Sequence, residues 1–330
     1  MNTMSTVVMG IYGKLMAVIQ KIIVWVIAAM VSAGTIVPPA TDNPIKAENP
    51  DDVKLSFTAI ADSQVNAFNT NRIYLDSLLA DVANAETRQD ALVIAGDITE
   101  NSLIEEWDVT YGLLGQYNVA DNYVMATGNH DIRLRTHEQA VERFTSYYND
   151  FTGSSIDELH YSMEVNGYTF VVVGSDAQSL EKQVISDEQL KWLDETISEA
   201  TADGDPVFVI IHQPLKNTHG LPALWNNGIG DSGHLGNQSD DVYEILNKYD
   251  NVIMISGHLH TGFGQYTYQE VGNIHSVNLP ATGKKNADGE YCEFSIGFTC
   301  EVYENEVIFR ARDFGKGIYL PEYDINIPLV

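Results

Sequence analysis

The chain has 330 residues, of which 44% are hydrophobic and 10% aromatic, so it can bury a full hydrophobic core. Acidic residues outnumber basic residues by 46 to 18, which gives a formal net charge of -28 at pH 7. A surface of this charge repels polyanions, so a nucleic-acid polymer is disfavoured both as a binding partner and as a substrate.

The N-terminal residues differ in composition from the rest of the chain. Lys14 and Lys21 form a positive flank, residues 22–37 are almost entirely apolar, and small residues surround Ala33. This order is typical of a secretory signal with cleavage after Ala33, and the same run could anchor an uncleaved chain in a membrane. Residues 1–37 are therefore predicted to be a signal peptide or membrane anchor. The protein is expected to be exported, either secreted or held at the cell surface.

Strands and helices are expected to alternate after a short linker. Residues 38–52 are rich in proline, asparagine and aspartate, which predicts the linker. The periodicity then predicts strands over residues 53–60, 91–95 and 123–126, and helices over residues 70–84, 103–116 and 136–148. Because strand–helix–strand units place parallel strands under helices, this part is predicted to be an α/β structure.

The second half of the chain continues the pattern. An Asn166-Gly167 turn is expected to join two strands, and a capping box at residues 186–189 to open a helix. The further elements are strands over residues 206–211 and 252–255, a helix over 240–248, and C-terminal strands with a turn at 304–305. No repeat or second linker interrupts this order, so residues 53–330 are predicted to form one domain.

Two features of this half allow more than one interpretation. Residues 216–238 have no periodicity, and such a long loop is usually functional, for example as a rim or lid. Its histidines, His219 and His234, are expected to be solvated unless they contact a substrate. Cys292 and Cys300 are the only cysteines, and they could form a disulfide only if a hairpin turn falls near residues 295–297.

Polar side chains follow the ends of the predicted strands. They are Asp62, Asp97, Asn129, His212, His258 and His260. Because the carboxyl ends of strands in an α/β sheet meet at one edge, we expect these side chains to converge there. Two carboxylates, an amide and three imidazoles suit a borderline divalent metal such as Mn, Zn or Fe. Six ligands exceed the needs of one four-coordinate ion and indicate two ions that share a carboxylate.

Two such ions are the usual arrangement for attack at phosphorus. They would lower the pKa of a shared water to give hydroxide and would bind the phosphoryl oxygens. His130 is not needed as a ligand and is placed to protonate the leaving oxygen. The pattern therefore predicts hydrolysis of a phosphoester by direct attack, without a covalent intermediate.

Five short motifs occur in a fixed order: Asp62-x-Gln64, Gly96-Asp97, Gly128-Asn129-His130-Asp131, His212 and Gly257-His258-x-His260. In this order they resemble the calcineurin-like metallophosphoesterase superfamily, over roughly residues 53–314. The resemblance implies a four-layer αββα sandwich with a dinuclear metal site. It implies that Asp62 and His260 hold the first metal and that Asp97 bridges. Asn129, His212 and His258 would hold the second metal, with His130 as general acid and Asp131 as its possible orienting partner.

Two positions raise questions about the first metal. Most of the family has histidine where this chain has Gln64. An amide oxygen is a weaker donor to a transition metal than imidazole, so either the first metal binds more loosely or Gln64 contacts substrate instead. Glu100 stands where purple acid phosphatases have a metal-binding tyrosine. It is expected either to bind metal or, more simply, to lie outside the coordination shell.

A further departure bears on the substrate. Ser/Thr protein phosphatases of this superfamily have an arginine directly before the Gly-Asn-His motif, where it binds phosphate. This chain has Thr127 at that position, which argues against a protein phosphatase. Arg133 could bind phosphate from the other side, or form a salt bridge at a helix end.

We therefore expect an exported phosphoesterase with two divalent ions, preferably Mn, that acts on a small phosphoester. A phosphodiester is the favoured substrate, and a phosphomonoesterase or nucleotidase is the second possibility. The third is a non-catalytic surface protein that binds metal or phosphate through a weakened first site. No protein partner is implied, and the only membrane contact would be the N-terminal segment if it is not cleaved.

Overall fold

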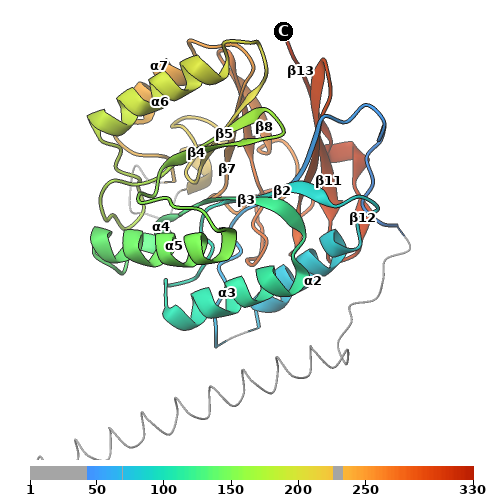
Figure 1. Ribbon diagram of the computed structural model, residues 1–330, viewed down its shortest axis with the longest axis horizontal. Helices are drawn as coiled ribbons and strands as arrows, with labels where there is room; N and C mark the ends of the chain where they lie inside the picture. Colours follow the sequence, from blue (N-terminus) through green and yellow to red (C-terminus); the bar gives the residue numbers. More distant parts are fainter. Residues whose placement is uncertain (1–42, 69, 226–232) are drawn as a thin grey trace, which may run out of the picture. The chain divides into compact units, whose positions relative to one another are not determined.

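The computed structural model describes residues 43–68, 70–225 and 233–330 (Figure 1). The predicted signal peptide or anchor, residues 1–37, lies outside the described residues. Within the described part, no helix has the length and apolarity needed to cross a membrane.

The first of two mixed sheets has seven strands, in the order β12-β11-β10-β1-β2-β3, and β13 pairs with β11 outside this path. The strands are β1 (Leu55–Ile60), β2 (Gln89–Ala95), β3 (Ala120–Ala126), β10 (Ile296–Val302), β11 (Glu306–Asp313), β12 (Ile318–Tyr319) and β13 (Ile325–Pro328). β1, β2 and β3 run parallel, and β10 pairs with β1 in the antiparallel direction. The carboxyl ends of β1, β2 and β3 therefore lie at one edge, as the sequence predicts.

The second sheet has six strands, in the order β4-β5-β6-β7-β9-β8. They are β4 (Tyr161–Val165), β5 (Tyr168–Val173), β6 (Val207–Ile211), β7 (Val252–Ser256), β8 (Tyr268–Val271) and β9 (Ile274–Asn278). β5, β6, β7 and β9 run parallel. Asn166 and Gly167 join β4 to β5 with φ of 51° and 88°, which confirms the predicted hairpin turn.

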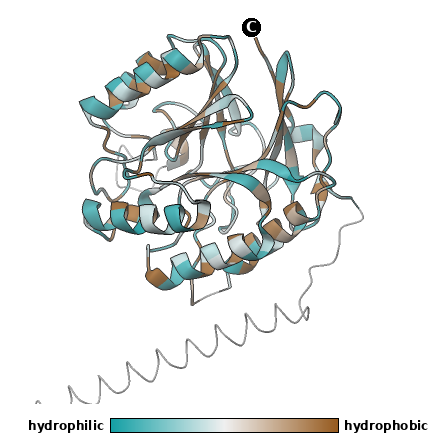
Figure 2. Ribbon diagram, viewed as in Figure 1, coloured by the Kyte–Doolittle hydropathy of each residue, from teal (hydrophilic) through white to brown (hydrophobic). Residues whose placement is uncertain are grey.

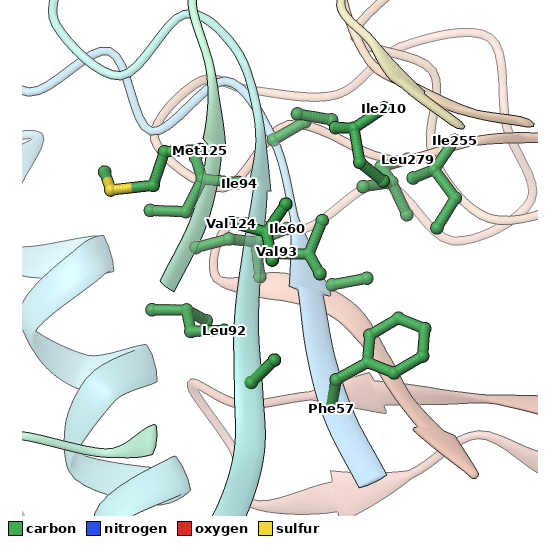
Figure 3. Close-up of a cluster of buried hydrophobic side chains, with 14 of the residues drawn as sticks. Phe57, Ile60, Leu92, Val93, Ile94, Val124, Met125, Ile210, Ile255 and Leu279 are labelled. Atoms are coloured by element: carbon green, nitrogen blue, oxygen red, sulfur yellow. The ribbon is translucent and has the colours of Figure 1, made fainter. Parts of the chain in front are cut away.

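The two sheets face each other across one buried cluster. The ring of Phe57 on β1 lies 5.4 Å from that of Phe170 on β5 and 5.1 Å from that of Phe208 on β6. Ile60 and Val93 of the first sheet belong to the same cluster as Ile210 and Ile255 of the second (Figure 3). Because these strands are buried on both faces, they read as continuous apolar runs in the sequence.

Helices cover the outer faces of both sheets, which gives the expected αββα layers (Figure 1). α2 (Arg72–Ala83), α3 (Ile104–Tyr117) and α5 (His137–Thr152) cover the first sheet, and α6 (Asp187–Ala200) and α7 (Ser239–Leu246) cover the second. Each carries both hydrophilic and hydrophobic residues, as a one-sided packing requires (Figure 2). The short elements are α4 (Asn129–Ile132), η1 (Ala223–Trp225) and η2 (Pro321–Tyr323).

Residues 43–52 are packed onto the domain, so the linker prediction is wrong for this stretch. Ile45 is buried, and its carbonyl oxygen accepts a hydrogen bond from the backbone of Glu86. The backbone N–H of Glu48 donates to the carboxylate of Glu301, and that of Asn49 to the hydroxyl of Tyr303. Polar composition suggested a free segment, but these backbone groups find partners far along the chain. The rest of the predicted linker, residues 38–42, lies outside the described residues.

The C-terminal strands and the cysteines complete the domain. β10 and β11 pair in the antiparallel direction around the predicted turn at residues 304–305. Cys300 is buried on β10 and Cys292 is partly buried in the segment before it, and both thiols are free. Burial raises the pKa of the Cys300 thiol well above its usual value. The structure therefore contains no bridge between the two cysteines.

Candidate metal centre

The polar residues singled out in the sequence lie together where the strands of both sheets end. Asp62 follows β1, Asp97 follows β2, Asn129 follows β3, His212 follows β6, and His258 and His260 follow β7. The backbone N–H of Asp62 donates to the carbonyl oxygen of Gly96 at 3.0 Å, and that of Gly257 to the carbonyl oxygen of His212 at 2.9 Å. These bonds fix neighbouring strand ends to one another and so place the side chains.

The turns that carry these residues have an uncommon backbone. Asp62, Asp97, His258 and His260 have φ of 51°, 50°, 73° and 51°, in the left-handed region that L-residues seldom adopt. Such conformations cluster at functional sites, where the surrounding structure holds them. Gly128 is required for a different reason, because a Cβ there would overlap the carboxylate of Asp97.

Two groups of candidate ligands share one carboxylate. Ligand atoms of Asp97, His212 and His258 all lie within 4.8 Å of one another, and so do those of Asp62, Asp97 and His260. His212 Nε2 is 3.3 Å from Asp97 Oδ1, and His260 Nε2 is 3.1 Å from Asp62 Oδ1. Asp97 is common to both groups, so two adjacent ions held by these residues would share its carboxylate, as in a dinuclear centre.

Unpaired atoms at the centre provide a test of whether cations fit there. The buried atoms without a hydrogen-bond partner in the described part of the chain include four from the candidate ligands: Gln64 Oε1, Asn129 Oδ1, His212 Nε2 and His258 Nε2. Buried polar atoms in proteins are normally hydrogen-bonded, so four unpaired nitrogen and oxygen atoms in one place need another partner. Oxygen and imidazole donors suit borderline divalent ions. The donor set therefore fits two divalent metals.

Hydrogen bonds behind the ligands aim them at the centre. His212 Nδ1 lies 2.8 Å from the carbonyl oxygen of Ala95, which leaves Nε2 to face Asp97. The backbone N–H of His258 donates to Asp62 Oδ2 at 2.9 Å, and the backbone N–H of His130 donates to Asp97 Oδ1 at 2.8 Å. The carboxylates are thus oriented by the same turns that carry the imidazoles.

Charges within the centre shift the acid–base behaviour of its residues. Burial alone would raise the pKa of Asp97, but the nearby imidazoles, His212 first, lower it far below its usual value. Burial opposes the charged form of His212, yet the carboxylates of Asp97 and Asp62 raise its pKa to about 9. Burial and the neighbouring His212 lower the pKa of His258 well below its usual value. His258 is therefore a neutral imidazole, ready to act as a ligand.

Gln64 lies in the centre with the other candidates. Its Nε2 donates to Asp97 Oδ2 at 3.0 Å, which leaves Oε1 as the buried, unpaired atom. Its backbone carbonyl accepts a hydrogen bond from the amide of Asn71, and its φ is 36°. The Gln64 side chain therefore points inward to the shared carboxylate.

His130 lies beside the shared carboxylate. Its Nδ1 is 2.7 Å from the carbonyl oxygen of Glu100, and its Nε2 is 3.9 Å from Asp97 Oδ2. The side chain retains 16% exposure. With Nδ1–H held by the carbonyl, Nε2 is the nitrogen that faces the centre and any leaving oxygen.

Asp131 does not have the orienting position that the sequence suggested. Its buried carboxylate accepts hydrogen bonds from the backbone N–H groups of Ile98, Thr99 and Gly128, and from the Thr99 hydroxyl, at 2.7–3.0 Å. Burial and the charge of Asp97 raise its pKa to about 6. Asp131 ties the turn after β2 to the turn after β3, and the carbonyl oxygen of Glu100 is the group that contacts His130.

Arg133 and Glu100 lie next to the centre without joining the ligand groups. Arg133 is half-buried, its backbone N–H donates to the carbonyl oxygen of Asn129, and its guanidinium makes no ion pair with any described residue. Phosphate binding by Arg133 therefore stays a prediction. Glu100 Oε2 lies 2.5 Å from Lys284 Nζ, so its carboxylate is engaged outside the two ligand groups. Sequence reasoning missed Lys284, because nothing in its local pattern points to Glu100.

The long loop contributes an aromatic side chain to the centre. Trp225 of η1 stacks on His258, with ring centroids 4.7 Å apart and ring planes 26° from parallel. Residues 226–232 lie outside the described residues. His219 is buried, with its ring bonded to the Tyr266 carbonyl oxygen and the Ser276 hydroxyl, and His234 is buried as well. The expectation that both histidines are solvated is therefore wrong.

Comparison with known proteins identifies the family. The model of the calcineurin-like phosphoesterase family matches residues 55–262, which include all the candidate ligands. The chain belongs to this family. A crystal structure of a dimetal phosphatase from Danio rerio has the same fold, with a TM-score of 0.61 at 15% identity, covering 84% of this chain and 100% of that chain.

Two relatives of this calcineurin-like phosphoesterase have names that describe hydrolysis at phosphorus. The probable glycerophosphodiester phosphodiesterase GpdQ of Arcobacter nitrofigilis is 24% identical over 213 residues, which are 63% of this chain and 71% of the relative. The manganese-dependent ADP-ribose/CDP-alcohol diphosphatase of Arabidopsis thaliana is 29% identical over 132 residues. That match spans 39% of this chain and 36% of the plant protein.

Proposed function

We propose that this protein is an exported, metal-dependent phosphodiesterase. The observation that carries the proposal is the pair of ligand groups that share Asp97, together with the buried acceptors that have no protein partner. A structural histidine or carboxylate would have its polar atoms paired within the protein. The acceptors of this centre are kept free, which is the condition for binding cations and a phosphoryl group.

The residues divide into ligands and a proton donor. Asp62, Gln64 and His260 would hold the first ion, Asn129, His212 and His258 the second, and Asp97 would contact both. Bound divalent ions supply a water of lowered pKa and positive charge for the phosphoryl oxygens. His130 Nε2 gives a proton to the leaving oxygen while Nδ1–H stays on the carbonyl oxygen of Glu100. No side chain is needed as a covalent nucleophile.

Three observations favour a diester substrate. The position before Gly128 holds the buried Thr127, where the phosphate-binding arginine of protein phosphatases would stand. A phosphodiester carries one negative charge on its phosphoryl group where a monoester carries nearly two, which suits a chain of net charge -28. One relative is named as a phosphodiesterase, and the other as a diphosphatase, which also cleaves at a phosphorus with two substituents.

Export and metal preference are part of the same proposal. The positive flank and apolar run within residues 1–37 support export as a secreted or anchored protein. The mixed oxygen and imidazole donors allow Mn, Fe or Zn, and the name of the plant relative supports Mn.

A paired-substrate assay tests the proposal. Residues 41–330 are purified with Mn²⁺, and hydrolysis of bis(p-nitrophenyl) phosphate is compared with that of p-nitrophenyl phosphate. We expect the diester to be hydrolysed at least as fast as the monoester, and Asp97→Asn to remove both activities. A clear preference for the monoester would make the protein a phosphomonoesterase or nucleotidase. Two bound ions without turnover would make it a non-catalytic metal- or phosphate-binding protein.

A further inference from the structure

Lys284 lies beside the proposed proton donor, and the reaction described so far gives it no role. Its Nζ is 2.5 Å from Glu100 Oε2, and its side chain is one-third exposed, at 34%. The other carboxylate oxygen of Glu100 is 3.7 Å from His130 Nδ1, and the carbonyl oxygen of Glu100 is 2.7 Å from the same nitrogen. Glu100 thus contacts Lys284 on one side and His130 on the other.

The loop that carries Lys284 is fixed against the metal centre. The backbone N–H of Gly283 donates to the carbonyl oxygen of Asp62 at 3.0 Å. Any side chain at Gly283 would overlap the carbonyl oxygen of Ser63, so the two segments lie in close contact. The amide of Asn286 accepts from the N–H of Ala281 and donates to its carbonyl oxygen, at 2.7 and 2.8 Å. The backbone therefore holds Lys284 in place, because its loop is bonded to the segment that carries Asp62.

Glu100 needs this partner for an electrostatic reason. Its carboxylate is 18% exposed and lies 3.7 Å from His130 Nδ1, while the carboxylate of Asp97 lies 3.9 Å from Nε2 of the same ring. Without Lys284, the carboxylate has no fixed partner, and the turn after β2 that carries it can move the Glu100 carbonyl oxygen away from His130 Nδ1. An ammonium at 2.5 Å gives the carboxylate a fixed partner of opposite charge.

We propose that Lys284 is a positioning residue for the proton donor. By pairing with the Glu100 carboxylate, Lys284 keeps the Glu100 carbonyl oxygen hydrogen-bonded to Nδ1–H of His130. His130 Nε2 then faces the leaving oxygen. The inference rests on the proposed function, in which His130 protonates the leaving group.

The test compares Lys284→Met with Lys285→Met. Lys285 is the next residue of the same loop and is exposed, so it controls for loss of a lysine charge. Each variant is assayed with a p-nitrophenyl diester, whose leaving group departs without a proton, and with an alkyl diester, whose leaving group needs one. For Lys284→Met we expect kcat on the alkyl diester to fall about tenfold, which is part of the roughly 10²–10⁴-fold that a general acid contributes, with KM unchanged. The p-nitrophenyl rate should change less than about twofold.

Several outcomes decide between positioning and other roles. Lys285→Met should match the wild type, and Lys284→Arg should keep most of the alkyl diester rate because it can still pair with Glu100. An equal fall of kcat on both substrates would overturn the proposal, since a general structural defect does not distinguish leaving groups. A rise in KM with kcat unchanged would also overturn it and would make Lys284 a substrate contact.

A spectroscopic measurement separates this inference from the proposed function. Long-range ¹H–¹⁵N spectra of the metal-free protein report which nitrogen of His130 carries the proton, with His130→Gln used for assignment. We expect the Nδ1–H tautomer in the wild type and a mixture of tautomers in Lys284→Met. An unchanged tautomer in the variant overturns the positioning role, even if the enzyme is active. If the wild type has no phosphoesterase activity, the proposed function is refuted. The His130 tautomer still shows whether Lys284 maintains the contact between the Glu100 carbonyl oxygen and His130 Nδ1.

Discussion

His212 Nδ1 lies 2.8 Å from the carbonyl oxygen of Ala95. His212 follows β6 of the second sheet and Ala95 ends β2 of the first, so this hydrogen bond joins the two sheets at the metal centre. It also leaves Nε2 facing Asp97 Oδ1 at 3.3 Å. One contact therefore fixes the relation between the sheets and the orientation of a candidate ligand.

The His212–Asp97 pair predicts a pH dependence of the metal-free protein. The pKa of His212 is raised from 6.5 to about 9, so its contribution to stability is fully present below pH 6.5 and is lost as the pH rises through 9. In EDTA, the free energy of unfolding should fall by about 3 kcal/mol between pH 6.5 and 9.5, measured by urea denaturation. His212→Asn should lack this decrease, and an equal decrease in that variant would contradict the assignment.

The same protonation predicts that metal binding depends on pH. An ion that binds His212 Nε2 must displace the proton held there below pH 9. The apparent affinity for Mn²⁺, measured by calorimetry, should therefore rise by up to about tenfold per pH unit from pH 6.5 toward 9. An affinity that stays constant over this range would show that His212 is not a ligand.

Asn129 and His130 are adjacent in the sequence but should have separable functions. Asn129 Oδ1 is buried without a partner, whereas His130 Nε2 faces the centre at 3.9 Å from Asp97. Both Asn129→Ala and His130→Ala should lower the rate on an alkyl diester by about 100-fold or more. Only Asn129→Ala should reduce the metal content measured by mass spectrometry. Full activity in His130→Ala would remove it as the proton donor.

The sequence predicted the positions of the candidate ligands because parallel strands have a simple geometry. Each buried apolar run ends at a polar residue, and parallel strand ends meet at one edge. The three segments that end in Asp62, Asp97 and Asn129 therefore had to converge in any such sheet. The second sheet adds His212 and the His258-x-His260 pair by the same rule, which is why the fold and the centre could be inferred together.

The contacts around the ligands could not be predicted, because their partners are distant or are backbone groups. Lys284 and Glu100 are far apart in the chain and meet only once the loop after β9 packs against Asp62. Asp131 follows His130 directly, which suggested a side-chain pair, but its actual partners are backbone amides of two different turns. Residues 43–52 have the composition of a linker, yet Glu48 bonds to Glu301. A local pattern contains no information on such partners.

Gln64 is the position where this chain departs from most of the family, and it can be tested by restoring histidine. Gln64 Oε1 is buried and unpaired beside Asp97, so an imidazole there would offer a stronger donor to the same ion. Gln64→His should tighten the weaker of the two Mn²⁺ sites by about tenfold, measured by calorimetric titration. Gln213→His is the matched control, since Gln213 is also buried but its Nε2 donates to the carbonyl oxygen of Glu181 instead of to the shared carboxylate of Asp97. Unchanged Mn²⁺ affinity in Gln64→His would show that Gln64 is not a ligand.

Asp131 should stabilise the fold rather than orient His130. Its carboxylate accepts hydrogen bonds from Ile98, Thr99 and Gly128, which belong to the turns after β2 and β3. Asp131→Ala would leave these buried N–H groups unpaired, so the free energy of unfolding should fall by about 3 kcal/mol, measured by urea denaturation with Mn²⁺ present. Asp131→Asn keeps an acceptor oxygen and should lose about half as much. If Asp131→Ala unfolds like the wild type but loses its rate on alkyl diesters alone, then Asp131 acts on His130 after all.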